Sequence, residues 1–171
     1  KRTVWAKVLQ SRGEMGYPYI FFTDNANNGA ADVYKDNNLP IYASNLCTEI
    51  MLPSDHNWSF VCVLSSINVL HYDKWKDTDA VETMIYFLDA VITEFLEKLE
   101  VYKNSDDLDD QQTFLFMERA YNFSKENRAL GMGVLGWHSL LQSKMLPFDS
   151  QGAFDLNSEV FKNIKEHSNK A

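Results

Sequence analysis

The chain has 171 residues, of which 45% are hydrophobic and 23% are charged, and this globular composition predicts a single domain over residues 1–171. Its net charge of −8 argues against non-specific binding of nucleic acid, because phosphate binding depends on Lys and Arg. The most apolar stretch, residues 81–99, contains four acidic side chains, so a membrane-spanning helix is excluded as well.

The cysteines and the amino terminus indicate the setting of the chain. Cys47 and Cys62 are too few for a disulfide framework and favour a reducing, cytoplasmic location. Residues 1–5 lack the apolar core of a signal peptide. The absence of an initiating Met predicts that the chain is an internal piece of a longer protein.

The first elements are predicted from the Gly and Pro residues that punctuate the sequence. Residues 4–10 have the pattern of the end of a helix, with Gly13 and Gly16 as stop signals. The aromatic and β-branched run at 17–23 predicts a buried strand. Residues 25–38 are rich in Asn, Asp and Gly and therefore predict a loop.

The middle of the chain predicts a strand and a long helix. Residues 60–64 and 67–70 indicate a second buried strand and its continuation. From residue 78 to residue 102 apolar side chains recur every three or four positions, which is the spacing of an amphipathic helix. Thr78 or Asp77 is expected to cap the start of this helix.

The last part of the chain continues the alternation of helices and strands. Residues 111–125 predict a helix, residues 128–135 a short glycine-rich strand, and residues 136–145 another helix. The apolar face of the first of these helices comprises Phe114, Met117 and Tyr121. A final helix is defined by Leu156, Val160, Phe161 and Ile164. This order of elements predicts the α/β class.

The segment from Ala43 to Ile50 concentrates the polar chemistry of the chain. In an extended segment side chains alternate between faces, which places an amide, a thiol and a carboxylate on one side: Asn45, Cys47 and Glu49. The other side is expected to anchor the segment in a core through Leu46, Thr48 and Ile50. The spacing leaves open a blander alternative, a buried structural Cys flanked by surface polar residues.

Metal and disulfide alternatives use the same cysteines. A zinc ligand set is available in Cys47, His56, Cys62 and His71. The spacing argues against a zinc site, because zinc ligands usually come in closer pairs. A disulfide between Cys47 and Cys62 is geometrically possible but is not expected in the cytosol.

The run Gly131–Gly136 matches the G-x-G-x-x-G pattern of dinucleotide-binding loops. That pattern requires a hydrophobic strand before the first Gly, whereas residues 125–128 have the character of the polar end of a helix. Close backbone packing at a strand-to-helix corner explains the glycines better than nucleotide binding does.

Several segments together resemble the large, catalytic subunit of class I ribonucleotide reductases. The string Asn45-Leu46-Cys47-Thr48-Glu49-Ile50, followed by residues 62–69, is similar to the active-site region of that family. Residues 17–27 resemble the strand before the loop, and residues 128–138 resemble a downstream corner. The resemblance covers nearly the whole chain and implies a partial segment of the family's ten-stranded α/β barrel.

The resemblance also implies roles for individual residues. Cys47 would become a thiyl radical and abstract the 3′ hydrogen of a ribonucleotide, while Glu49 would accept the proton of the 3′ hydroxyl. Asn45 would hydrogen-bond the ribose hydroxyls. The implied substrate-binding stretch comprises Ser44, Asn45, Leu46, Cys47, Thr48 and Glu49. Cys62 would be one of two redox cysteines that supply the reducing equivalents, with its partner outside this chain.

The family's other parts are expected to lie outside these residues. Even an eight-stranded barrel takes roughly 250 residues, so the isolated chain is expected to be inactive and to self-associate. No metal or other cofactor is expected here, because the radical would come from a separate metal-containing small subunit. The other expected partners are the remaining segments of the large subunit, its nucleotide effectors and a thioredoxin- or glutaredoxin-type reductant. Neither nucleic acid nor a membrane is expected as a partner.

Two other functions remain compatible with the residues. One is a non-catalytic α/β interaction domain that merely shares the motif, and the other is a Cys/His zinc-binding domain. Zinc analysis and the thiol reactivity of Cys47 would separate these alternatives from a radical enzyme.

Overall fold

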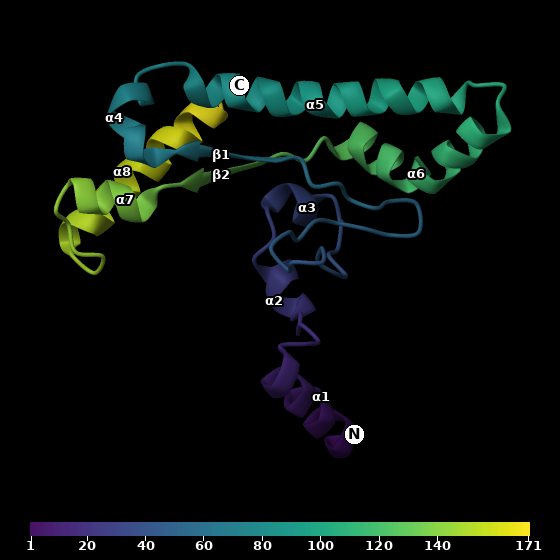
Figure 1. Cartoon of the computed structure of the whole chain (residues 1–171), viewed down its shortest axis with the longest axis horizontal. Coiled ribbons are helices and arrows are strands. Elements are labelled where there is room, and N and C mark those ends of the chain that lie inside the picture. The colour runs from purple at the N-terminus through teal and green to yellow at the C-terminus, as the bar shows by residue number, and fades with distance from the viewer. The chain divides into compact units, whose positions relative to one another are not determined.

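A computed structural model describes residues 1–171 and divides into two compact units, residues 1–60 and residues 61–171 (Figure 1). The first unit contains three helices: α1 (Arg2–Met15), α2 (Thr23–Asn28) and α3 (Asp32–Asp36). The second unit contains the two strands and the longer helices. None of the helices has the length and apolar content that crossing a membrane requires.

Helix α1 ends where the sequence indicates, but only at the second of the two glycines. Gly16 adopts a left-handed conformation with φ of 77°, and its N–H donates to the carbonyl of Arg12. This is the usual way in which a glycine terminates a helix. Gly13 lies inside α1, so its assignment as a stop signal is wrong: a single Gly within a helix is tolerated at a modest cost.

The strand predicted at residues 17–23 is wrong. Tyr17, Tyr19 and Phe22 are exposed, and the segment has no regular structure before α2 begins. A strand needs a neighbour for its backbone hydrogen bonds, and the first unit contains no strand at all. The aromatic rings of Tyr17 and Tyr19 instead stack with their centroids 5.4 Å apart.

The loop predicted at residues 25–38 is also wrong, because it contains most of α2 and all of α3. Asparagine commonly favours loops, but here two of its side chains support helical turns. Asn27 Nδ2 donates to the carbonyl of Thr23 at 2.8 Å, and Asn37 Nδ2 donates to the carbonyl of Val33 at 2.7 Å. Each of these bonds adds a side-chain donor to a carbonyl one turn earlier in the chain.

The second unit follows the predicted order closely. It comprises β1 (Leu64–Asn68), a 3-10 turn η1 (Val69–His71), α4 (Tyr72–Trp75), α5 (Ala80–Lys103), α6 (Leu108–Asn127), β2 (Gly131–Leu135), α7 (Trp137–Ser143) and α8 (Gln151–Ser168). The predicted strand around residues 60–70 is confirmed only over β1. The N-cap of α5 is Asp79, which makes no side-chain cap hydrogen bond, so the predicted capping by Thr78 or Asp77 is wrong. Thr78 Oγ1, one residue earlier, accepts a hydrogen bond from the N–H of Ala80 at 3.3 Å.

Strands β1 and β2 form a parallel pair, in register from Leu64 opposite Gly131 to Asn68 opposite Leu135. Two parallel strands need a long connection, which α5 and α6 supply between them. The glycines of β2 permit close packing: a side chain at Gly131 would collide with Leu64. Gly136 has φ of 83° and lies against Asn68 at the strand-to-helix corner, as expected.

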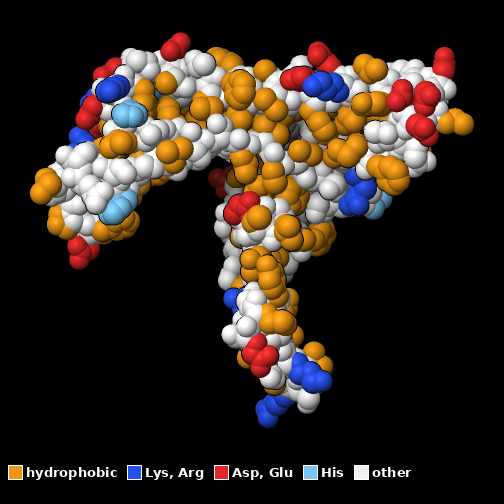
Figure 2. All heavy atoms as spheres, in the orientation of Figure 1, with side chains coloured by type: hydrophobic (Ala, Val, Ile, Leu, Met, Phe, Trp, Pro, Cys, Tyr) orange, Lys and Arg blue, Asp and Glu red, His pale blue; other side chains and the backbone are white.

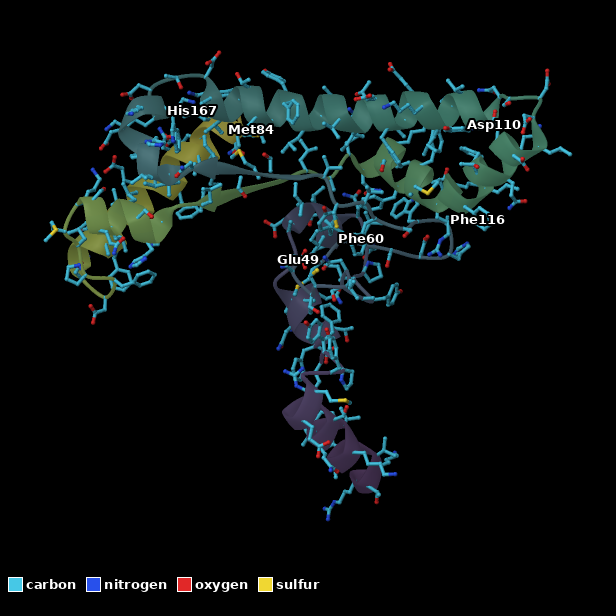
Figure 3. The ribbon with its side chains drawn as sticks, in the orientation of Figure 1. Glu49, Phe60, Met84, Asp110, Phe116 and His167 are labelled. Carbon is cyan, nitrogen blue, oxygen red and sulfur yellow. The ribbon has the colours of Figure 1, made fainter.

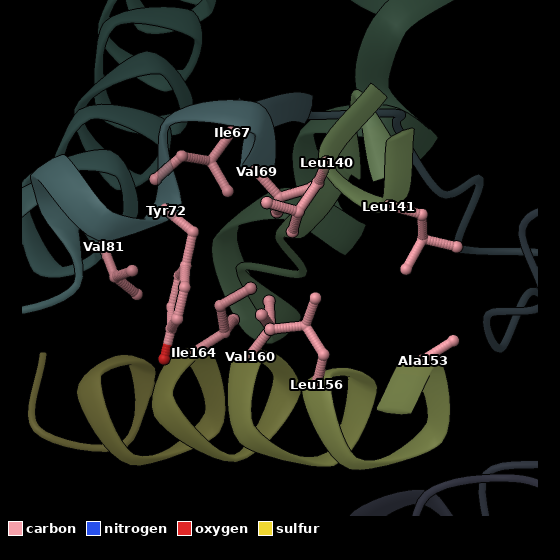
Figure 4. Packing of buried hydrophobic residues seen from close by; sticks show 10 residues of the cluster. All are labelled: Ile67, Val69, Tyr72, Val81, Leu140, Leu141, Ala153, Leu156, Val160 and Ile164. Carbon is pink, nitrogen blue, oxygen red and sulfur yellow. The ribbon is translucent and has the colours of Figure 1, made fainter. Parts of the chain in front are cut away.

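The main core lies between the sheet and helices α5, α7 and α8. Its buried members are Ile67, Val69, Tyr72, Val81, Leu140, Leu141, Ala153, Leu156, Val160 and Ile164 (Figure 4). The predicted face of α8 is confirmed for three residues, whereas Phe161 is 44% exposed and packs near Trp137. A smaller cluster of Leu99, Phe114 and Tyr121 joins α5 to α6. The chain is therefore α/β, mostly helical, with a small sheet.

Candidate active site around Cys47

Cys47 lies in a turn, not in an extended segment. Leu46 and Cys47 form the turn, and Thr48 adopts a left-handed conformation with φ of 67°. The N–H of Thr48 donates to the carbonyl of Asn45 at 3.1 Å, and the N–H of Asn45 donates to the carbonyl of Ile50 at 3.4 Å. The predicted alternation of side chains between two faces is therefore wrong for this stretch.

The side chain of Asn45 explains why the chain turns here. Its Oδ1 accepts hydrogen bonds from the N–H groups of Glu49 at 3.1 Å and Ile50 at 3.0 Å. Asparagine readily bonds backbone groups a few residues ahead in this way, and such bonds compete with an extended conformation. The hydroxyl of Ser44 donates to the carbonyl of Asn45 at 3.1 Å and adds to the same turn.

The turn exposes the thiol. Cys47 is exposed, and Leu46 beside it is 90% exposed, so the predicted anchoring of Leu46 in a core is wrong. Thr48 and Ile50 are half-buried and hold the base of the turn, while Glu49 is exposed (Figure 3). The alternative that Cys47 is a buried structural cysteine is wrong, because its side chain is exposed.

Two open hollows flank the turn within the first unit. One, of about 270 Å³, is lined by Cys47 and Thr48 together with Arg12, Tyr19 and Ile20. The other, of about 260 Å³, is lined by Ile20, Phe21, Phe22, Asn25, Ala26, Thr48 and Met51. The aromatic run predicted as a strand therefore borders the cysteine turn. Its position beside the turn was not foreseen, because neither hydrophobic period nor spacing shows how a loop folds back.

The other candidate residues lie in the second unit or form no cluster. Cys62 comes just before β1, and neither cysteine forms a disulfide. No group of three or more His, Cys, Asp or Glu side chains in the chain is placed to hold a metal ion. The residues of the zinc hypothesis therefore do not come together as a set of metal ligands: Cys47, His56, Cys62 and His71.

Comparisons with known proteins agree with the resemblance. The ribonucleotide reductase barrel-domain family model matches residues 1–171. The chain is 37% identical over 164 residues to the putative ribonucleoside-diphosphate reductase large subunit of Frog virus 3, covering 96% of this chain and 27% of that protein. It is 34% identical over 165 residues to the ribonucleoside-diphosphate reductase large subunit of Invertebrate iridescent virus 3, covering 96% of this chain and 24% of that one.

A solved structure is similar over the same length. The class Id ribonucleotide reductase alpha subunit of Actinobacillus ureae superposes with a TM-score of 0.80 at 51% identity, covering 98% of this chain and 30% of that one. The chain thus spans about a quarter of the length of the curated relatives named above. Because the family model covers every residue, the chain belongs to the ribonucleotide reductase barrel-domain family of large subunits.

Proposed function

We propose that this chain forms part of the catalytic large subunit of a class I ribonucleotide reductase, which reduces ribonucleotides to deoxyribonucleotides for DNA synthesis. The observation that carries the proposal is the exposed Cys47 thiol. It sits in a hydrogen-bonded turn beside an open hollow, within a chain that matches the family throughout.

In the proposed reaction Cys47 acts first. Its thiyl radical takes the hydrogen atom from C3′ of the ribonucleotide, so that the S–H bond forms as the C–H bond breaks. Glu49 accepts the proton of the 3′ hydroxyl, a role that suits an ionised carboxylate because it has only acceptor oxygens. The exposure of both side chains leaves them accessible to a sugar.

The proposal gives Asn45 two tasks. Its Oδ1 is engaged by the backbone of Glu49 and Ile50, while Nδ2 of the same amide carries two further N–H donors. We assign those donors to the ribose hydroxyls, with residues 44–49 as the substrate-binding stretch. Orientation of this kind lowers the barrier by holding the reacting atoms close together.

Cys62 supplies reducing equivalents in the same scheme. Its thiol and a second thiol outside this chain together give up two electrons and two protons and become a disulfide. A thioredoxin- or glutaredoxin-type reductant then restores both thiols in the cytoplasm. The radical originates in a separate metal-containing small subunit, and nucleotide effectors bind elsewhere on the large subunit.

We also propose that β1 and β2 are neighbouring strands of the family's ten-stranded α/β barrel. The parallel pairing and the long helical connection support this placement. Many apolar side chains on α5 and α6 are exposed, including Phe87, Leu115 and Phe116 (Figure 2). Surfaces of this kind normally lie against other protein, so the remaining segments of the subunit are expected to cover them. The isolated chain should self-associate and show no activity.

Replacement of the Cys47 thiol tests the function. In a complete subunit that carries these residues, assayed with its small subunit, Cys47→Ser should abolish deoxyribonucleotide formation while substrate still binds. The reason is that a serine O–H bond is too strong to serve as the hydrogen carrier. Equilibrium binding of the ribonucleotide and product formation measure the two halves separately. Appreciable turnover by Cys47→Ser would contradict the proposed role.

A further inference from the structure

Asn27 ties helix α2 to the segment that leads into the Cys47 turn. Its side-chain Nδ2 donates to the carbonyl of Ile41 at 2.8 Å, and its Oδ1 accepts from the N–H of Ile41 at 2.8 Å. The same Nδ2 also donates to the carbonyl of Thr23 one turn back in α2. One amide side chain thus satisfies both backbone groups of a residue well separated from it in the sequence.

The geometry resembles one rung of a β-ladder in which a side chain replaces the second strand. Ile41 is 1% exposed, so its N–H and C=O cannot rely on water for hydrogen bonds. Leaving either group unpaired would incur its full desolvation cost, because a buried donor or acceptor without a partner has lost its hydrogen bonds to water. Because Asn27 meets this need, the backbone of Ile41 is fixed in position and direction relative to α2.

Helix α2 also borders the turn itself. Asn25 and Ala26, the two residues before Asn27, line the same hollow as Thr48 and Met51. The helix therefore bonds to the cysteine segment at Ile41, where the segment enters, and shares a hollow with the base of the turn. Both features lie within the first unit.

We propose that Asn27 is a positioning residue for Cys47: by clamping Ile41, it sets where the turn places the thiol. The inference rests on the proposed function, in which Cys47 takes a hydrogen atom from the substrate. Atom transfer requires contact between sulfur and the C–H bond, and a displacement of about 1 Å can cost roughly a hundredfold in rate. Asn27 touches neither the thiol nor the hollow beside it, so its effect is indirect.

The test uses Asn27→Ala and Asn27→Asp in a complete subunit assayed with its small subunit. The first removes all three hydrogen bonds, while the second keeps an acceptor for the Ile41 N–H and loses the amide donors. Asn37→Ala is the matched control, because Asn37 makes only a local bond to the carbonyl of Val33. Cys47→Ser reports separately on the proposed function.

The informative readout is the isotope effect on kcat with substrate deuterated at C3′. A displaced thiol slows C–H cleavage, so this step limits the rate more and the isotope effect grows. A purely structural loss reduces the amount of active enzyme, which lowers the rates of both isotopologues equally. We expect both Asn27 variants to lose about tenfold or more in kcat with little change in KM and with a larger isotope effect.

Two results would overturn the inference about Asn27 while leaving the proposed function intact. One is a kcat within about twofold of the parent in both Asn27 variants. The other is a fall in kcat that matches the loss of folded protein, measured by circular dichroism, with an unchanged isotope effect. If instead the parent forms no deoxyribonucleotide, or Cys47→Ser keeps its activity, the proposed function fails and the inference fails with it.

Discussion

Each of the two units of the molecule is stabilised internally by a different kind of contact. Residues 61–171 bury a continuous apolar cluster, in which side chains such as Val69 and Val160 are completely inaccessible. In residues 1–60 the buried residues are only Ala26, Ile41 and Pro53. There, amide side chains from Asn27 and Asn45 bond directly to the backbone of loop segments.

The difference shows how a reactive turn can be fixed without a core around it. Apolar packing is strong but not directional, and it excludes water from whatever it surrounds. Hydrogen bonds from side chain to backbone are directional, so they define a turn while leaving its tip exposed. The role proposed for Cys47 requires access to a substrate, and the polar framework of the first unit leaves the thiol exposed.

Shortening a side chain in the main core should give the largest loss of stability. The loss should be confined to the second unit. Leu140 is 2% exposed within the main cluster, so Leu140→Ala should lower the free energy of unfolding by about 2–5 kcal/mol. Leu108→Ala is the control, because Leu108 is 79% exposed on α6 and should change stability by only about 0.5 kcal/mol. Thermal unfolding of the chain measures both.

Hydrogen exchange of the same Leu140→Ala variant sharpens the comparison. Amide protection should fall across α7, α8 and β1, whereas the amides of Glu49 and Ile50, which are bonded to Asn45, should be unaffected. Equal loss of protection in both units would show that the two regions share one cooperative structure, contrary to their separate contact patterns.

A smaller effect is expected from the polar contact between α5 and α8. His167 Nδ1 and Glu82 Oε1 lie 2.7 Å apart. The pKa of Glu82 is lowered, chiefly by a hydrogen bond from its own backbone and then by His167, while burial opposes the shift. Because the folded-state pKa is lowered, the Glu82 carboxylate stabilises the fold at pH values above 4.5, the ordinary pKa of the group. This contribution is lost as the pH falls through the folded-state pKa.

Glu82→Gln should therefore flatten the pH dependence of stability in the acid range. Thermal unfolding between neutral pH and acid should show the parent losing more stability than this variant, by less than the Leu140→Ala effect. Glu118→Gln, at an exposed site on α6, is the control and should follow the parent curve. Parallel curves for the parent and Glu82→Gln would exclude a stabilising role for the pair.

The sequence predicts the second unit much better than the first. Helices α5 and α8 bury one face each, so their apolar spacing is visible in the sequence, and the β2 glycines mark a close strand contact. Helix α6 fits its predicted face less well, because Met117 is exposed and Phe123 is buried. Residues 17–23 have strand composition but no partner strand in their unit. Periodicity does not show whether a neighbour exists.

The sequence supplies candidate residues for the site but does not predict the shape of the segment that carries them. Cys47 and Glu49 are identified by their chemistry and by resemblance, yet the alternation argument fails because Asn45 bonds ahead to the backbone and turns the chain. The clamp from Asn27 to Ile41 joins residues far apart in the sequence. Such pairings depend on three-dimensional proximity, which composition and spacing do not contain.

The central claim is that Cys47 breaks the 3′ C–H bond and that Cys62 acts only afterwards. A substrate tritiated at C3′ tests it directly, because tritium transferred to a thiol exchanges into water. In a complete subunit with its small subunit, Cys62→Ser should release tritium but form no deoxyribonucleotide over many turnovers. Cys47→Ser should release none. Tritium release by Cys47→Ser at the parent's rate would contradict the account.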